Sequence, residues 1–362
     1  MGFDSFLGNA KAVRSVRDML ARGRVPGSLL FTGPEGVGKK TLAFMLAKAL
    51  NCERRGPGGD DFCGECAHCR RADEMFAASR EDLVRRRDVK DAQRRVEGIL
   101  YLDIQLIEPL TRFILIEQIR QLRATAYARP FELAQRVILV DDAQAIHWQA
   151  ADLLLKVLEE PPESTTLILI CPNAFELRPT IRSRCLTLQF SPVEDAFIER
   201  ILAEERQLPE AQWALATRVI SGSITRAKTF DPAGFLQQRQ PWLDFLEVVA
   251  GAQGRPPGPR EWKLLFDTTK TLAGTEIETA LKTGSLLFRD LAHILAQENS
   301  PEVTNVDLKS RLKTWAHRLG MAGIEKLAES VEEAYRLQTR NINQQLSLDS
   351  LAAELALHTL AP

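Results

Sequence analysis

Residues 33–40 read Gly-Pro-Glu-Gly-Val-Gly-Lys-Lys, and this stretch decides the fold of the chain. A phosphate-binding loop needs glycines for close approach of the backbone, a lysine for the β- and γ-phosphates, and then a serine or threonine hydroxyl for Mg²⁺. The glycines and Lys39 meet the first two requirements, but Lys40 occupies the hydroxyl position. An ammonium group has no lone pair for a metal. The sequence therefore predicts a loop that binds phosphate but is poorly built for hydrolysis.

The segments around this loop place it in an α/β domain. A short apolar run, residues 29–32, precedes the loop, and residues 41–50 have helical spacing. This order of strand, loop and helix favours a phosphate site over a chance glycine turn. Further strands are expected from solid apolar runs at 136–140, 167–171 and 185–190. Such strands, separated by helical stretches, predict a parallel sheet covered on both faces.

Two acidic residues, Asp141 and Asp142, follow the strand expected at 136–140. In phosphate-loop folds the first acid reaches Mg²⁺ through water, and the second position normally carries a glutamate that polarises the attacking water. Asp142 is one methylene shorter, which matters for a base that must lie within about 3 Å of a water. A solvated turn or a helix cap is the alternative interpretation of the pair.

Thr41 comes one residue after the hydroxyl position. A helix turns about 100° per residue, so this hydroxyl is expected to point elsewhere. The candidate residues of the phosphate site are Gly33, Gly36, Gly38, Lys39, Lys40, Thr41, Asp141 and Asp142.

A cluster of cysteines lies within residues 52–69. Cys52, Cys63, Cys66 and Cys69 have the spacing C-x10-C-x2-C-x2-C, which predicts a tetrahedral, structural Zn²⁺ site with no open position. A disulfide or redox role is the weaker alternative, because no export signal precedes the cluster. His68 lies within the second turn and could compete as a ligand, although four thiols suffice without it.

Length and composition bound the class of protein. The 362 residues predict two or three domains, and 45% hydrophobic with 26% charged residues is typical of a soluble globular chain. A net charge of −1 argues against a surface that is wholly devoted to nucleic acid. There is no secretory signal and no apolar run of about 18 residues, so we expect a cytoplasmic protein without membrane contact.

The strand pattern stops after Pro192, and the rest of the chain has helical patterns. We therefore expect three domains. These are an α/β phosphate-loop domain at 1–190 that contains the cysteine module, a small helical lid at 191–230, and an all-α domain at 231–362.

Together these motifs resemble the clamp-loader branch of the AAA+ ATPases of bacterial DNA polymerase III, over nearly the whole chain. The most specific stretch is Leu-Leu-Lys-Val-Leu-Glu-Glu-Pro-Pro at 154–162, followed by Ser183, Arg184 and Cys185. The remaining matches are the loop and the cysteine module, with residues 6–9, 116–120, 140–143, 180–182, 222–227 and 341–346.

The resemblance implies a hetero-pentamer that uses ATP to open a ring-shaped sliding clamp and place it on primed DNA. The implied partners are gamma/tau and delta subunits, the clamp, and DNA reached through the complex, with 231–362 forming the oligomerising collar. In the family's stator-type subunit, an arginine of a Ser-Arg-Cys motif acts in trans at the ATP site of a neighbouring motor subunit. Arg184 occupies that position, where a planar guanidinium would meet developing phosphate charge.

Departures from the motor pattern decide between two roles. Motor subunits carry threonine where this chain has Lys40, glutamate where it has Asp142, and threonines near Cys171-Pro172-Asn173; Arg226 is also displaced by one position. We therefore expect a stator-type subunit of the polymerase holoenzyme, with structural Zn²⁺ and little or no ATPase of its own. ATP is expected only as a weak or vestigial ligand, and Lys40 argues against Mg²⁺. The alternatives are an active gamma/tau-type ATPase and a DNA-binding or repair helper that borrows the fold.

Overall fold

The structure is a computed structural model that describes residues 2–56, 58–90, 102–251, 257–273, 277–298 and 300–338, with 345–346, 348–350 and 352–353. Its contacts divide the chain into two units, 1–201 with 221–226, and 202–220 with 227–362. This division passes through the expected lid at 191–230, so the three-domain division stays a prediction. Residues 341–344 of the collar motif lie outside the described residues.

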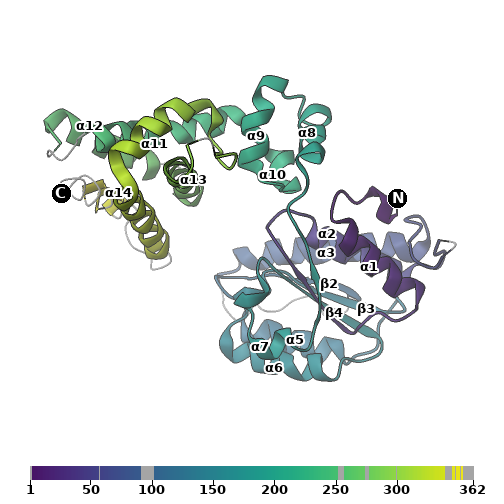
Figure 1. Cartoon of the computed structure of the whole chain (residues 1–362). Coiled ribbons are helices and arrows are strands. Elements are labelled where there is room, and N and C mark those ends of the chain that lie inside the picture. The colour runs from purple at the N-terminus through teal and green to yellow at the C-terminus, as the bar shows by residue number, and fades with distance from the viewer. Residues whose placement is uncertain are drawn as a thin grey trace. The chain divides into compact units, whose positions relative to one another are not determined.

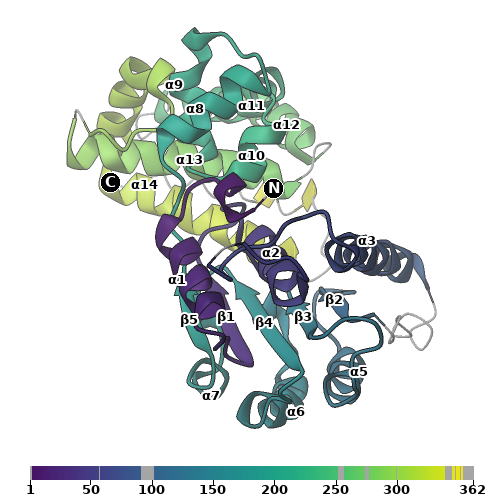
Figure 2. The same cartoon turned by 90° about the vertical axis from the view of Figure 1, so that its right-hand side faces the viewer.

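A five-stranded parallel sheet forms the centre of the first unit, with strand order β2-β3-β4-β1-β5. Figure 2 shows this order across the sheet. The strands are β1 (Ser28–Thr32), β2 (Ile104–Ile107), β3 (Arg136–Val140), β4 (Thr165–Cys171) and β5 (Leu186–Gln189). The first four are buried along their whole length, as expected of a sheet covered on both faces.

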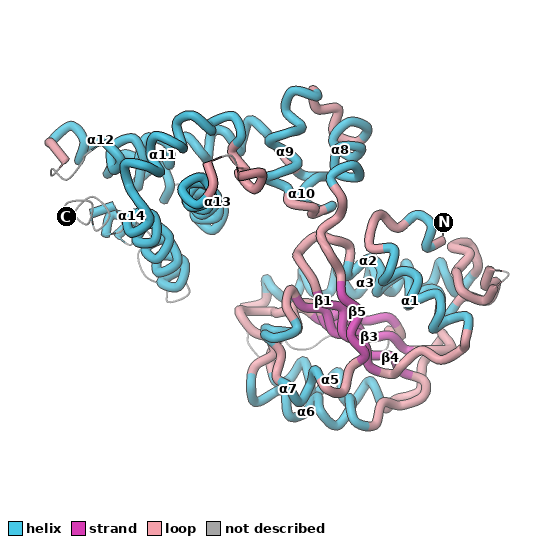
Figure 3. The backbone as a smooth tube through the Cα atoms, viewed as in Figure 1, coloured by secondary structure: helices cyan, strands magenta, loops and turns pink. Residues whose placement is uncertain are grey.

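Helices cover both faces of this sheet (Figures 1 and 3). One layer contains α1 (Ala10–Ala21), α2 (Lys39–Asn51) and α3 (Ala67–Asp88), and the other contains α5 (Ile116–Ala126), α6 (Trp148–Glu159) and α7 (Pro179–Arg182). Short 3-10 helices are η1 (Phe3–Ser5), η2 (Ala143–Ala145) and η3 (Ala174–Glu176). The predicted fold class, a parallel α/β phosphate-loop domain followed by helices, is confirmed.

Strand β2 was not expected from the sequence. Its four residues include Gln105, which interrupts the apolar pattern although it is buried. The side-chain amide of Gln105 donates to the carbonyl of Leu102 at 2.8 Å, so its burial leaves that amide paired.

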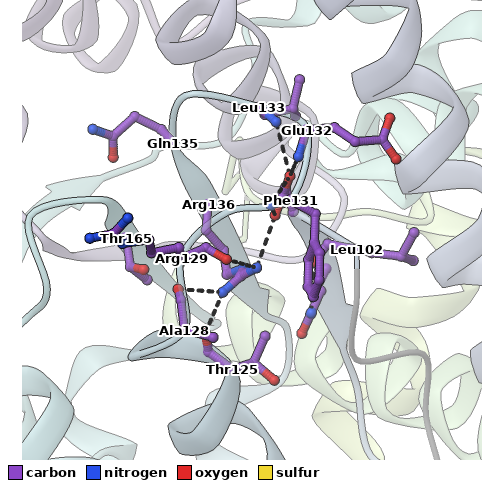
Figure 4. A network of polar contacts seen from close by, with 12 residues as sticks. Leu102, Thr125, Ala128, Arg129, Phe131, Glu132, Leu133, Gln135, Arg136 and Thr165 are labelled. Atoms are coloured by element: carbon purple, nitrogen blue, oxygen red, sulfur yellow. Dashed lines mark hydrogen bonds and ion pairs between the residues drawn. The ribbon is translucent and has the colours of Figure 1, made fainter.

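A buried ion pair fixes the loop between α5 and β3 (Figure 4). Arg136 and Asp103 are both fully buried, with Nη2 of Arg136 donating to the carboxylate at 3.0 Å. The same guanidinium donates to the carbonyls of Thr125, Ala128 and Arg129. Asp103 accepts the backbone N–H groups of residues 131–133. The two buried charges are thereby paired with each other and with one loop. Among the described residues, Nε of Arg136 is the atom of this pair that is buried without a hydrogen-bond partner.

The remaining described helices lie after the sheet. They are α8 (Asp195–Glu204), η4 (Glu210–Gln212), α9 (Trp213–Ile220), α10 (Ile224–Thr229), α11 (Pro232–Gly251), α12 (Pro259–Ala273), α13 (Ile277–Ala296), η5 (Val306–Leu308) and α14 (Lys309–Gln338). The second unit has its own hydrophobic core, in which Trp242 packs edge-on against Phe245 and Phe288. Within the described parts of the chain, no helix combines the length and apolar character needed to span a membrane.

Candidate functional site

The phosphate loop connects β1 to α2, and its glycines are needed for space as well as for backbone conformation. Gly36 and Gly38 have φ values of 74° and 96°, which side chains other than glycine rarely adopt. A Cβ atom at Gly33 would lie 2.3 Å from the carbonyl oxygen of Phe190, and one at Gly36 would lie 2.0 Å from Oγ of Ser223. The loop is therefore packed between the end of β5 and the start of α10.

Lys39 closes the loop on itself. Its ammonium donates to the carbonyl of Gly33 and, at 2.6 Å, to that of Pro34. The residue is 7% exposed, and burial lowers the pKa of its ammonium although nearby acids oppose the shift. Lys39 thus holds the loop in a curved form at the start of α2, where free N–H groups favour an anion.

Lys40 lies between two carboxylates. Its Nζ is 2.6 Å from Oδ2 of Asp141 and 2.7 Å from Oε1 of Glu108, and Nη2 of Arg87 contacts the other oxygen of Glu108 at 2.7 Å. Burial alone would raise the pKa of Glu108, but its partners Lys40 and Arg87 bring it below its usual value. Burial raises the pKa of Asp141, which Lys40 only partly offsets. The hydroxyl position of the loop is therefore filled by a cation that is paired with Asp141.

The predicted phosphate-site residues, apart from Gly33, come together around one cavity of about 600 Å³. Thr41 is exposed on α2 beside it. Asp142 is also exposed; its backbone is left-handed with φ 51°, and its side chain accepts a hydrogen bond from Gln144 at 3.2 Å. The two acids of the expected metal site therefore have separate partners. Asp141 pairs with Lys40, and Asp142 contacts Gln144 within its own turn.

Sequence reasoning did not identify Glu108, the second partner of Lys40. Glu108 follows β2, and β2 is the neighbour of β3 in the sheet, so Glu108 and Asp141 meet at the same edge. The available signal was an acid directly after residues 104–107, in which only Gln105 interrupts the apolar pattern. Phe44 and Phe76, whose stacked ring centroids are 4.1 Å apart, also line the cavity and were not identified.

These side chains do not fit a magnesium ion as they stand. Mg²⁺ requires a near-octahedral set of oxygen ligands, bound through carboxylates, waters and phosphate. At this position the oxygens of Asp141 and Glu108 already accept from an ammonium that repels a dication. While Lys40 holds this position, these oxygens of Asp141 and Glu108 are not available to Mg²⁺.

The four predicted cysteine ligands form a single cluster. Their Sγ atoms all lie within 4.8 Å of one another, and Cys52 is 3.7 Å from Cys63 and 4.0 Å from Cys66. A Zn–S distance of 2.3 Å in a tetrahedron corresponds to about 3.8 Å between sulfurs. The donor set therefore fits a closed, structural Zn²⁺ site.

Backbone N–H groups point at the sulfurs of Cys63 and Cys66 and favour the thiolate form of both, whereas burial raises the pKa of the Cys52 and Cys69 thiols. The N–H of Cys66 lies 3.3 Å from Sγ of Cys63, and the N–H of Cys69 lies 3.4 Å from Sγ of Cys66. Although burial acts in the opposite direction, the hydrogen bonds bring the pKa of the Cys66 thiol down to about 6. His68 contacts Asn51 and Glu53 through its two ring nitrogens, which leaves the thiols as the donor set.

Arg184 lies away from the phosphate loop. It precedes β5, whereas the loop follows β1, and the two strands are parallel neighbours with Leu29 opposite Leu186. The loop lies beyond the carboxyl end of β1, and Arg184 lies before the amino end of β5. The two are therefore at opposite ends of the strands, separated by about the length of a strand. The side chain of Arg184 is 34% exposed, and its guanidinium lies 2.6 Å from Glu159 and donates to the carbonyl of Thr180 at 2.8 Å.

Comparison with known proteins identifies the family of this α/β phosphate-loop chain. The model of the family described as "DNA polymerase III, delta subunit" matches residues 8–194, more than half of the chain. The chain therefore belongs to this family of DNA polymerase III subunits.

Similar proteins include the DNA polymerase III subunit delta' of Bacillus subtilis, which is 24% identical over 349 residues, 95% of both chains. The DNA polymerase III subunit tau of Escherichia coli is 28% identical over 230 residues, or 62% of this chain and 32% of that protein. The solved structure of a gamma subunit-related protein from Thermotoga maritima covers 96% of this chain and 99% of its own at 14% identity, with a TM-score of 0.47. The sequence match to subunit delta' extends over nearly the full length of both proteins.

Proposed function

We propose that this chain is the stator-type, delta-prime subunit of a bacterial clamp loader. In this role it helps to place a sliding clamp on primed DNA, and it donates Arg184 to the ATP site of a neighbouring subunit. Gamma/tau and delta subunits are the proposed partners in a hetero-pentamer, and DNA is reached through the assembly. A cytoplasmic location remains the expectation.

The observation that carries this proposal is the position of Arg184. A guanidinium stabilises phosphate charge only within hydrogen-bond reach, and Arg184 lies at the other end of the strands from the chain's own phosphate loop. Its partners Glu159 and Thr180 hold it in one orientation while about a third of the side chain stays exposed. A fixed, accessible arginine that cannot serve its own pocket is suited to serve another subunit.

The pocket supports the non-motor half of the proposal. Lys40 cannot bind a metal, and Asp142 is turned onto Gln144 and lacks the reach of a glutamate. The residues for attack by water are therefore not assembled. Zinc would stabilise the module at 52–69 and would take no part in phosphate chemistry.

The experiment compares ATP turnover by the isolated chain with turnover by the complex reconstituted with gamma/tau and delta subunits. We expect no turnover above background from the chain alone and clamp-stimulated turnover from the complex. Turnover by the isolated chain that Lys39→Ala abolishes would instead establish a gamma/tau-type motor. Failure to assemble with clamp-loader subunits would favour the repair-helper alternative.

A further inference from the structure

The ion triad of Lys40, Asp141 and Glu108 does more than remove a hydroxyl from the phosphate loop. It places an ammonium that is paired with two carboxylates beside the loop, at the carboxyl ends of β2 and β3. Both carboxylates are mostly buried, with side-chain exposures of 17% for Asp141 and 16% for Glu108. Without a cation between them they would repel each other and remain poorly solvated.

The phosphate-binding half of the pocket is preserved beside this triad. The glycine conformations, the start of α2 and Lys39 supply the backbone donors and charge that bind a phosphate chain. Lys39, Lys40 and Arg80 line the same cavity, together with the carboxylates of Glu35, Asp141 and Asp142. An anion that enters it therefore meets three cationic side chains, and Lys40 already neutralises Asp141. In a nucleotide site, a divalent cation ordinarily neutralises the phosphates and connects them to the acidic side chains.

We propose that this pocket binds the phosphate chain of a nucleotide without a divalent cation, with the Lys40 ammonium in the position that magnesium would need. The proposal deepens the proposed function, because it concerns the ligand of a pocket that does not hydrolyse it. ATP is bound as the metal-free anion, and Mg²⁺ competes with the protein for it. No bond is made or broken in the pocket.

The triad also connects the elements that surround the pocket. Lys40 ties α2 to the ends of β2 and β3 through two charge-assisted contacts, and Arg87 extends this contact to α3. The Lys40 ammonium is part of the chain and is always present, whereas a magnesium ion is present only when it binds together with a nucleotide. The pocket of this subunit is therefore set independently of magnesium.

The test measures ATP affinity by titration calorimetry on the full-length, zinc-loaded chain, once in magnesium-free buffer without a chelator and once in excess MgCl₂. We expect ATP to bind in the magnesium-free buffer and to bind more weakly in MgCl₂, because Mg²⁺ competes for the same phosphate oxygens. Binding that MgCl₂ leaves unchanged or strengthens would overturn the proposal. Absence of ATP binding under both conditions would overturn it as well.

The variant Lys40→Thr restores a hydroxyl and frees the two acids. We expect its ATP affinity to rise about tenfold or more with MgCl₂, and its melting temperature to rise when MgCl₂ and ATP are added together. The matched control is Lys313→Thr, which removes a lysine paired with Glu298 at 2.8 Å in the second unit. The control should bind ATP like the parent chain in both buffers.

The parent titrations need no variant, so the proposal stays testable if Lys40→Thr does not fold. A folded Lys40→Thr that gains no magnesium dependence would contradict the role given to Lys40. These measurements are also separate from the stator role. If metal-free ATP binding is refuted, Arg184 can still support turnover in the reconstituted complex. If Arg184 proves unnecessary for that turnover, metal-free ATP binding can still be correct.

Discussion

The guanidinium of Arg184 lies 2.6 Å from the carboxylate of Glu159, the last residue of α6. A second contact at 2.8 Å, to the carbonyl of Thr180, fixes the same group from α7. Both partners belong to the stretches that resemble the clamp-loader family, 154–162 and 180–185. The two motifs thus form one structural unit that orients an arginine toward the surface.

Replacing Arg184 by alanine is expected to leave assembly intact and to slow ATP turnover in the reconstituted complex. The reason is loss of the charge that would stabilise the transition state in a neighbouring site, for which about 10³-fold is expected at that site. Steady-state turnover and gel filtration of the complex would measure the two properties. The control is Arg178→Ala, which removes an exposed arginine paired with Asp152 at 2.8 Å. Equal turnover in both variants would exclude the proposed role.

Replacing Cys66 by serine is expected to release zinc and destabilise residues 52–69. Structural zinc is linked to folding, and a serine hydroxyl would not replace the thiolate ligand, which also accepts the backbone N–H of Cys69. Metal content and protease resistance of the module would report the change. Cys185→Ala is the matched control, since Cys185 lies outside the cluster and should leave zinc content unchanged. A parent protein without zinc would contradict the site.

Much of the fold could be predicted from the sequence because its central strands are solid apolar runs. The strands expected at 29–32, 136–140, 167–171 and 185–190 correspond to β1, β3, β4 and β5, with ends that differ by a few residues. The glycine loop and the cysteine spacing are likewise local patterns, and the structure brings their residues together. Local spacing is sufficient for these features.

The features that were missed depend on contacts distant in sequence. Lys40 could be recognised as a lost hydroxyl, but its pairing with Glu108 spans 68 residues and depends on β2 lying beside β3. Arg136 was included in a strand pattern without any expectation that its charge would be buried on Asp103. A single sequence reports which residues are charged, and it does not report which distant charge will lie beside them.

Replacing Asp103 by alanine is expected to cost about 3–5 kcal/mol of local stability. The change would leave the buried Arg136 guanidinium without its counter-charge and would also free the N–H groups of residues 131–133. Hydrogen exchange of the amides in β2 and β3 would measure the loss within this unit, where a whole-chain melting curve would mix two units.

A control for this change lies in the same loop. Glu132→Ala removes a two-point ion pair with Arg71, at 2.6 and 2.7 Å, in which both side chains are more than a third exposed. Solvent screens such a pair, so we expect a much smaller loss than for Asp103→Ala. If both variants accelerated exchange equally, burial would not be what makes the Asp103 pair important.

Replacing Gly284 by alanine is expected to destabilise the second unit, although alanine is the better helix former. An added Cβ would lie 2.7 Å from Cε2 of Trp242, whose fully buried indole donates to the carbonyl of Ala280 at 2.8 Å and cannot move freely. Overpacking of this kind costs about 1–3 kcal/mol, which exceeds the roughly 1 kcal/mol gained in helix propensity. Gly251→Ala, at the end of α11 with open space around it, should be neutral or stabilising. Urea unfolding followed by tryptophan fluorescence would compare the stabilities of the two variants. A stabilised Gly284→Ala would mean that the Trp242 side chain can move to make room for the added methyl group.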